Sequence, residues 1–192
     1  MKRGLHQVHS KILTRSKKQG GLSITDLEKW NRAAVVGLVY RLVAKEDSLW
    51  VRFMWKHNIK NKDFWDMKVP QDCSWAWRKI LQNREDAAKV LRSSIGDGNS
   101  VSFWHDVWAS STPLANLVSV QQRSSSGIGE KEKVCNFIVN GNWDLSLVSL
   151  PQYVKDLVAQ VPISTRARPD KLISIVNPSG NYSVKSTYEA MQ

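Results

Sequence analysis

Residues 63–114 contain the segments Phe64-Trp65-Asp66, Ser74-Trp75-Ala76-Trp77-Arg78-Lys79-Ile80-Leu81, Ile95-Gly96-Asp97-Gly98-Asn99 and Phe103-Trp104-His105-Asp106-Val107-Trp108. Five of the nine tryptophans of the chain fall in this stretch. Indole rings bury large areas, and a cluster this dense therefore predicts a hydrophobic core with one ring left at the surface. Because Trp65 sits in a basic loop rather than on a helical stripe, we expect it to be the exposed ring, able to stack on a base.

Apolar residues at helical spacing predict three helices in the N-terminal half. Thr25-Asp26-Leu27-Glu28 has the spacing of a capping box, and it precedes an inward face of Leu27, Trp30, Ala34, Leu38 and Leu42. Asp47 can cap a second helix, with Leu49, Trp50, Phe53 and Met54 inward. Ser74 can cap a third, with a buried stripe of Trp77, Ile80, Leu81, Ala88 and Leu91.

Turn residues predict two β-hairpins. The first runs from Ser94 to Trp104 around Gly96-Asp97-Gly98-Asn99. The second pairs residues 171–176 with 182–185, and we expect it to be loosely attached. Between them we expect a short helix at 134–139, a turn at 140–142 and a helix at 153–161, while a second capping-box spacing at 186–189 suggests a helix start. The predicted fold class is α+β: a mainly helical N-terminal half with a Trp-rich core and a hairpin, then a smaller helix and hairpin unit.

Composition along the chain predicts four parts. Residues 1–22 form a basic flexible segment ending at a Gly-Gly turn, and residues 23–120 a Trp-rich connection domain. The Ser- and Gly-rich residues 121–132 are predicted to be a linker. Residues 133–192 are predicted to form a small α/β unit that ends in a truncated domain, because a helix start so close to the last residue cannot be stable by itself.

The positive charge lies in one half of the chain. Residues 1–92 carry the whole net charge of +11, because they contain 20 Lys and Arg against 9 Asp and Glu. Residues 93–192 contain 8 of each and are neutral. A one-sided excess favours a polyanionic partner such as nucleic acid, although a basic face can also serve solubility. The candidate phosphate contacts are Arg15, Lys17, Lys18, Arg52, Lys56, Lys60, Lys62, Arg78 and Lys79.

Few residues suggest catalysis. His105 and Asp106 are adjacent and, in an extended segment, would point to opposite faces, so we expect a structural hydrogen-bonding role rather than an acid–base pair. Asp97 is expected to be a turn residue, since no further carboxylates follow at calcium-site spacing. His6 and His9 lack a third metal ligand. We predict no catalytic residue, no metal, no cofactor and no small-molecule substrate.

The cysteine content favours a reducing environment. Cys73 and Cys135 are isolated, without a CxxC pair or a secretory leader, which suggests an intracellular protein, nuclear or cytoplasmic. No run approaches the roughly 20 apolar residues of a membrane span, so we expect no membrane association.

The sequence resembles a known family at many short motifs. Ser16-Lys17-Lys18-Gln19-Gly20-Gly21-Leu22-Ser23-Ile24-Thr25-Asp26-Leu27 resembles the "PKKEGGLGIRDL" segment downstream of the polymerase palm in plant LINE-type (non-LTR) retroelement reverse transcriptases. The resemblance continues through the Trp-rich segments quoted above to Pro113-Leu114. It ends at Gly180-Asn181-Tyr182-Ser183-Val184-Lys185-Ser186, which looks like the opening of the family's zinc-binding-in-reverse-transcriptase domain. Ser16 and Ser23 replace a proline and a glycine that are common in the family.

The resemblance implies a binding role without chemistry. The palm aspartates of the family lie upstream of this region, and its zinc-binding cluster and ribonuclease H carboxylates lie downstream; none of them is present here. The chain then corresponds to the connection between the polymerase thumb and the zinc-binding domain. It would hold the RNA template or the RNA–DNA hybrid beside the remaining reverse transcriptase domains of a transposable-element polyprotein. A relic reading frame of a decayed retroelement, without selected activity, is the alternative; an independent nuclease is a weaker one.

Overall fold

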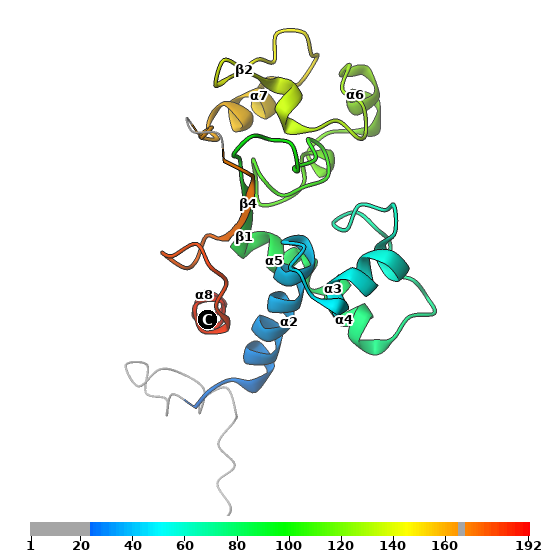
Figure 1. Ribbon diagram of the computed structural model, residues 1–192, viewed down its shortest axis with the longest axis vertical. Coiled ribbons are helices and arrows are strands. Elements are labelled where there is room, and N and C mark those ends of the chain that lie inside the picture. Colours follow the sequence, from blue (N-terminus) through cyan, green and yellow to red (C-terminus); the bar gives the residue numbers. More distant parts are fainter. Residues whose placement is uncertain (1–23, 165–167) are drawn as a thin grey trace, which may run out of the picture.

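The computed structural model describes residues 24–164 and 168–192. Within them the fold is mixed, with seven α-helices, two two-stranded antiparallel sheets and buried aromatic clusters. Figure 1 shows two lobes joined by β1 and β4. The helical lobe contains α2, α3, α4, α5 and α8, and the loop-rich lobe contains α6, α7 and the β2–β3 hairpin.

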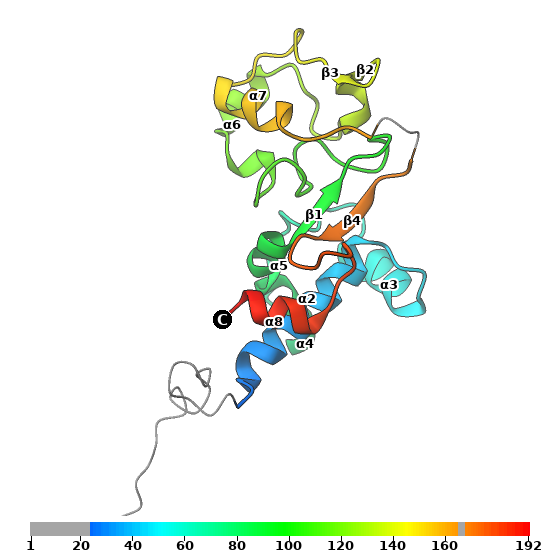
Figure 2. The same cartoon turned by 90° about the vertical axis from the view of Figure 1, so that its left-hand side faces the viewer.

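The helical lobe is built around α2 (Leu27–Val43), as Figure 2 shows. Asp26 caps it, accepting hydrogen bonds from the backbone N–H groups of Glu28 and Lys29. The predicted capping box placed the cap at Thr25, one residue earlier, and does not form, because the Asp26 carboxylate takes these N–H groups instead. The helix is present and Leu42 is buried, both as predicted, but the rest of the inward face is different. Leu27 and Trp30 are exposed, whereas the buried residues are Ala33, Val36, Val39 and Leu42. The prediction was wrong because apolar residues lie on more than one side of this helix, so spacing alone does not select the buried side.

The local sequence pattern predicted α4 (Trp75–Gln82) more accurately than α3 (Leu49–Met54). Ser48, rather than Asp47, caps α3, and Leu49 and Phe53, predicted to face inward, are exposed. A π-helical turn (Trp55–Ile59) follows α3. In α4 the predicted cap Ser74 and the buried Trp77, Ile80 and Leu81 are confirmed. The predicted third helix is interrupted at Asn83, after which α5 (Arg84–Val90) begins.

Neither of the two predicted hairpins forms. Instead β1 (Leu91–Ser94) pairs with β4 (Lys171–Ser174), with Leu91 opposite Ser174 and Ser94 opposite Lys171. The glycine turn does not return along β1, because its N–H groups bind the carboxylate of Asp170 just ahead of β4. Gly98 has a φ of +72°, and a Cβ there would lie 2.6 Å from the backbone nitrogen of Cys135, so this turn requires glycine.

The end of the chain packs firmly on α2. Helix α8 (Val184–Ala190) is capped by Ser183, three residues before the predicted start. The Tyr188 hydroxyl accepts a hydrogen bond from the Asp26 N–H at 3.1 Å, and the Tyr182 hydroxyl donates to the Ala33 carbonyl. Residues 182–185, predicted to be one strand of a loosely attached hairpin, therefore belong to a firmly packed end of the chain.

The loop-rich lobe has its own aromatic core. Phe103, Trp104 and Trp108 are buried there, and the Trp108 indole N–H donates to the Phe103 carbonyl at 3.0 Å. Two short 3₁₀ helices (Leu114–Asn116 and Val134–Phe137) and α6 (Val120–Ser125) surround this core. The predicted turn at Asn140 and Gly141 joins β2 (Ile138–Val139) to β3 (Asn142–Trp143), and α7 (Gln152–Ala159) buries Val154 and Val158.

Residues 121–132, predicted to be a linker, include most of α6 and the buried Ile128 of the second core. Among the described residues, no helix is long and apolar enough to cross a membrane.

Candidate nucleic-acid interface

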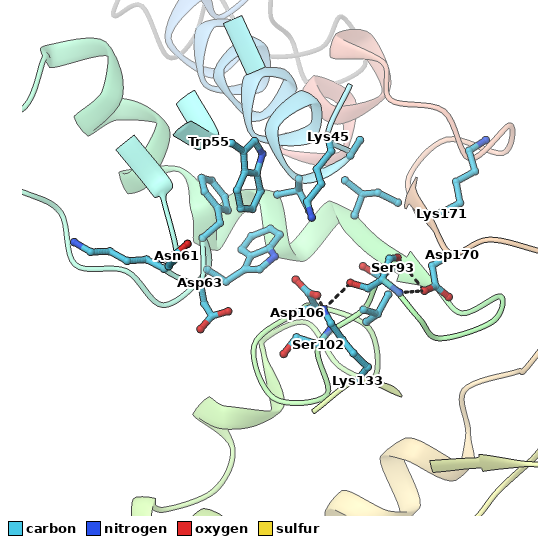
Figure 3. A pocket seen from close by; sticks show the side chains of 18 of the residues that line it. Lys45, Trp55, Asn61, Asp63, Ser93, Ser102, Asp106, Lys133, Asp170 and Lys171 are labelled. Carbon is cyan, nitrogen blue, oxygen red and sulfur yellow. Dashed lines mark hydrogen bonds between the residues drawn. The ribbon is translucent and has the colours of Figure 1, made fainter. Parts of the chain in front are cut away.

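A groove lies between the two lobes, close to the β1–β4 pair (Figure 3). Its volume is about 430 Å³. The segment after α2 and the loop after the π-helical turn form one wall, and the loop at residues 100–106 and the start of β4 form the other. Phe64 and Trp65 contribute aromatic surface to its lining. The groove therefore combines segments far apart in the chain.

Five lysines line this groove: Lys45, Lys60, Lys62, Lys133 and Lys171. All are exposed except Lys133, which is half-buried and donates a hydrogen bond to the Ser100 carbonyl at 3.0 Å. The Lys45 ammonium lies 4.9 Å from the centre of the Trp55 ring, a distance typical of cation–π contacts. Figure 3 shows Lys45 on the α2 side of the groove, opposite Asp106 and Lys133. Ammonium groups in this arrangement can bind phosphates.

Asp170 at the groove edge organises the glycine turn. One carboxylate oxygen accepts from the N–H groups of Gly96 and Gly98, both at 2.8 Å, and the other from the N–H and hydroxyl of Ser100, both at 2.9 Å. Partial burial alone would raise the pKa of Asp170, but these hydrogen bonds outweigh it and hold that pKa below its ordinary value. The negative charge of Asp170 is therefore already engaged by the protein.

Asp106 is a different kind of carboxylate. Desolvation raises its pKa, although a hydrogen bond from the Ser102 N–H at 2.7 Å and the charges of Lys133 and Lys45 act in the opposite direction. Its neighbour His105 is buried, with Nε2 3.1 Å from a carboxylate oxygen of Glu130. The two side chains thus have separate partners, which confirms the expected structural hydrogen bonding. Asp97 accepts from the Asn99 N–H at 3.1 Å, as a turn residue does.

The sequence-predicted cations lie in different places. Lys60 and Lys62 line the groove. Arg52 and Lys56 lie beside Phe53 at a shallow apolar hollow on α3, and Arg78 and Lys79 lie on α4. Arg15, Lys17 and Lys18, like His6 and His9, fall outside the described residues. Sequence reasoning thus identified two of the five groove lysines.

Lys45, Lys133 and Lys171 were missed, and so was Asp170. No local pattern marks them, because they come from three segments that only the β1–β4 pairing and the glycine turn bring together. Lys133 and Lys171 even belong to the half of the chain whose charges balance.

Trp65 is not the exposed ring. It is 9% exposed and packs in the core of the helical lobe, with its ring centre 5.6 Å from that of Phe64. Of the five clustered tryptophans, Trp75 is the exposed one, at 70%. The prediction was wrong because the loop at residues 60–70 folds inward, burying Phe64, Trp65 and Met67 against the helices.

The described residues contain no group of three or more His, Cys, Asp or Glu side chains placed to hold a metal ion. Fold and groove together define an α+β protein with a lysine-lined groove between two lobes. No family model matches the chain. No solved structure matches it.

Two plant proteins are similar to this chain. One, from Arabidopsis thaliana, is named "Putative ribonuclease H protein At1g65750"; it is 28% identical over 210 aligned positions, which cover 99% of this chain and 31% of that protein. The second is the Arabidopsis thaliana "Uncharacterized mitochondrial protein AtMg00310", 30% identical over 118 positions that cover 60% of this chain and 77% of that protein. The chain belongs to the same family as this mitochondrial protein. It spans about a third of the length of the first relative.

Proposed function

We propose that this chain is a non-catalytic, nucleic-acid-binding segment of a plant LINE-type retroelement reverse transcriptase. In this proposal its groove contacts the phosphates of an RNA template or RNA–DNA hybrid. The similarity to a protein named for ribonuclease H supports a retroelement origin, and the motifs after residue 16 support the more specific assignment. The rest of the polyprotein would supply polymerisation and ribonuclease H activity.

The observation that carries this proposal is the set of five lysines around one groove. Three carboxylates share the groove, Asp63, Asp106 and Asp170. Asp170 already accepts four hydrogen bonds within the protein, so its carboxylate is engaged by the fold. With five lysines against three carboxylates, the groove keeps an excess of positive charge. The local balance therefore favours phosphate binding.

The test is binding of the purified chain to an RNA–DNA hybrid over a salt series, with tryptophan fluorescence as the signal. Binding through phosphates weakens linearly on a log–log plot, because counterions are released. Replacing Lys60 and Lys62 with alanine should lower affinity at low salt and reduce the slope by about 0.9 for each phosphate that these lysines neutralise in the wild-type complex.

A matched control replaces Lys155 and Lys185, which lie outside the groove, with alanine. This variant removes the same charge, so an equal loss of affinity would mean that net charge, not the groove, binds the hybrid. Absence of binding by a folded wild-type sample at low salt would refute the proposal and favour the relic interpretation.

A further inference from the structure

The outer face of α4 presents an exposed indole among cations. Trp75, Arg78, Lys79 and Gln82 follow one another at helical spacing and all are exposed, while Trp77, Ile80 and Leu81 of the same helix are buried. Trp75 is 70% exposed, although tryptophan is usually among the most buried side chains of a domain. The Trp75 ring is therefore not part of the hydrophobic core.

The neighbours of Trp75 are positively charged. The Lys79 ammonium lies 5.9 Å from the centre of its ring, within cation–π range. Arg78, three residues after Trp75 on the same helix face, donates a hydrogen bond of 2.7 Å from its guanidinium to the Gln71 carbonyl. Helix α4 contains no acidic residue, and residues 67–82 contain Lys68, Arg78 and Lys79 against the single carboxylate of Asp72.

An exposed indole among cations favours a nucleic-acid ligand over a protein partner. Apart from Trp75 and the small Ala76, the outward residues of α4 are cationic or amide side chains, so this face carries no extended apolar patch of the kind that marks many protein-docking surfaces. An indole flanked by cations matches a nucleotide, whose base has a π-face and whose phosphate is an anion. In a duplex the base faces are covered by their neighbours, so only an unpaired base can stack on the ring.

We propose that Trp75 is a stacking platform for an unpaired base of single-stranded nucleic acid, with Lys79 and Arg78 contacting the adjacent phosphates. This inference rests on the proposed function and extends it, because it adds a single-strand contact on α4 to the hybrid contact in the groove. The platform takes the role that the sequence suggested for Trp65. RNA and DNA share this chemistry, so either strand can be the ligand.

The test measures affinity for a single-stranded RNA of about 12 nucleotides, within the site sizes usual for such surfaces, and for a DNA of the same sequence. Trp75→Ala should weaken binding at least about 5-fold, as loss of a base–aromatic stack does. Trp75→Phe keeps a π-face and should retain most of the affinity, whereas Trp75→Leu keeps apolar area alone and should behave like alanine. Loss with RNA only, DNA only or both supports the platform and identifies the strand.

Leu147→Ala is the control, because Leu147 is an apolar side chain that is 95% exposed in the other lobe. Thermal melting should be unchanged in all variants, since neither residue is part of a core. Equal affinity of Trp75→Leu and Trp75→Phe would overturn stacking in favour of apolar docking, and unchanged single-strand affinity of Trp75→Ala would overturn the platform altogether.

The two proposals fail separately. If hybrid binding depends on Lys60 and Lys62 while Trp75→Ala leaves single-strand binding intact, only the platform is refuted. If the wild-type chain binds neither hybrid nor single strand, the proposed function is refuted and the platform with it.

Discussion

Asp170→Ala should destabilise the junction between the lobes, since this carboxylate fixes residues 96–100. It accepts four hydrogen bonds, from Gly96, Gly98 and, twice, Ser100. Gly98 is buried, so its N–H would lose its partner without access to water, at a cost of about 1–3 kcal/mol. Gly96 is half-buried and Ser100 is exposed, so losing each of their hydrogen bonds to Asp170 costs less, about 0.5–1.5 kcal/mol. We expect a total of about 2–4 kcal/mol, because exposed groups regain hydrogen bonds to water.

Asp170→Asn refines this estimate. Its amide oxygen can still accept from Gly96 and Gly98, but its NH₂ group would face the N–H of Ser100. We therefore expect a smaller loss than for alanine, about 1–2 kcal/mol. The order of the three proteins, wild type above asparagine above alanine, follows from the direction of the hydrogen bonds and not from side-chain size.

Urea denaturation followed by tryptophan fluorescence measures these losses as shifts of the midpoint at constant slope. Asp72→Ala is the control, because Asp72 is an exposed carboxylate and its loss should stay within about 0.5 kcal/mol. A loss of less than about 0.5 kcal/mol for Asp170→Ala would refute the reasoning. It would mean that the glycine turn holds its shape without the carboxylate.

The remaining predictions concern the core and the pH dependence of stability. Trp77→Ala should cost about 3–5 kcal/mol in urea denaturation, because the ring is 3% exposed in the helical core; a cost below roughly 1 kcal/mol would place it at the surface. Burial raises the pKa of Asp106 in the folded state, so the folded protein holds the proton of Asp106 more tightly than the unfolded chain does. The stability of the fold therefore falls as pH rises from the ordinary carboxyl pKa through the raised one. Asp106→Asn should remove that slope and leave stability at neutral pH no lower than wild type in urea midpoints measured across the acid range. A clear loss at neutral pH would show that the ionised carboxylate stabilises through Lys45 and Lys133. The lowered pKa of Asp170 has the opposite sign: its stabilisation is present above the ordinary carboxyl pKa and is lost as pH falls through the lowered value.

Strand pairing shows where prediction from sequence ended. The glycine turn after β1 was expected to fold back on the neighbouring residues, as a turn of this composition commonly does. In the structure its N–H groups bind Asp170, more than 70 residues away, and β1 pairs with β4. Nothing near residue 96 in the sequence announces that partner, so both hairpin predictions were wrong for the same reason.

The exposed tryptophan was misassigned for a related reason. Trp65 and Trp75 each lie near basic residues, and composition cannot tell which ring the fold buries. The loop carrying Trp65 turns inward because Phe64 and Met67 bury with it, whereas Trp75 occupies the solvent side of α4.

The sequence by itself determined the local features: the cap at Ser74, the buried stripe of α4, the turn at Asn140 and Gly141, and the use of most clustered tryptophans as core. Each depends on hydrogen bonds or spacing within a few residues, which the chain order fixes. The tertiary structure decided the β1–β4 pair, the buried side of α2, the groove lysines and the exposed Trp75. These depend on contacts between segments far apart in the chain, and their partners are chosen only when the whole core packs.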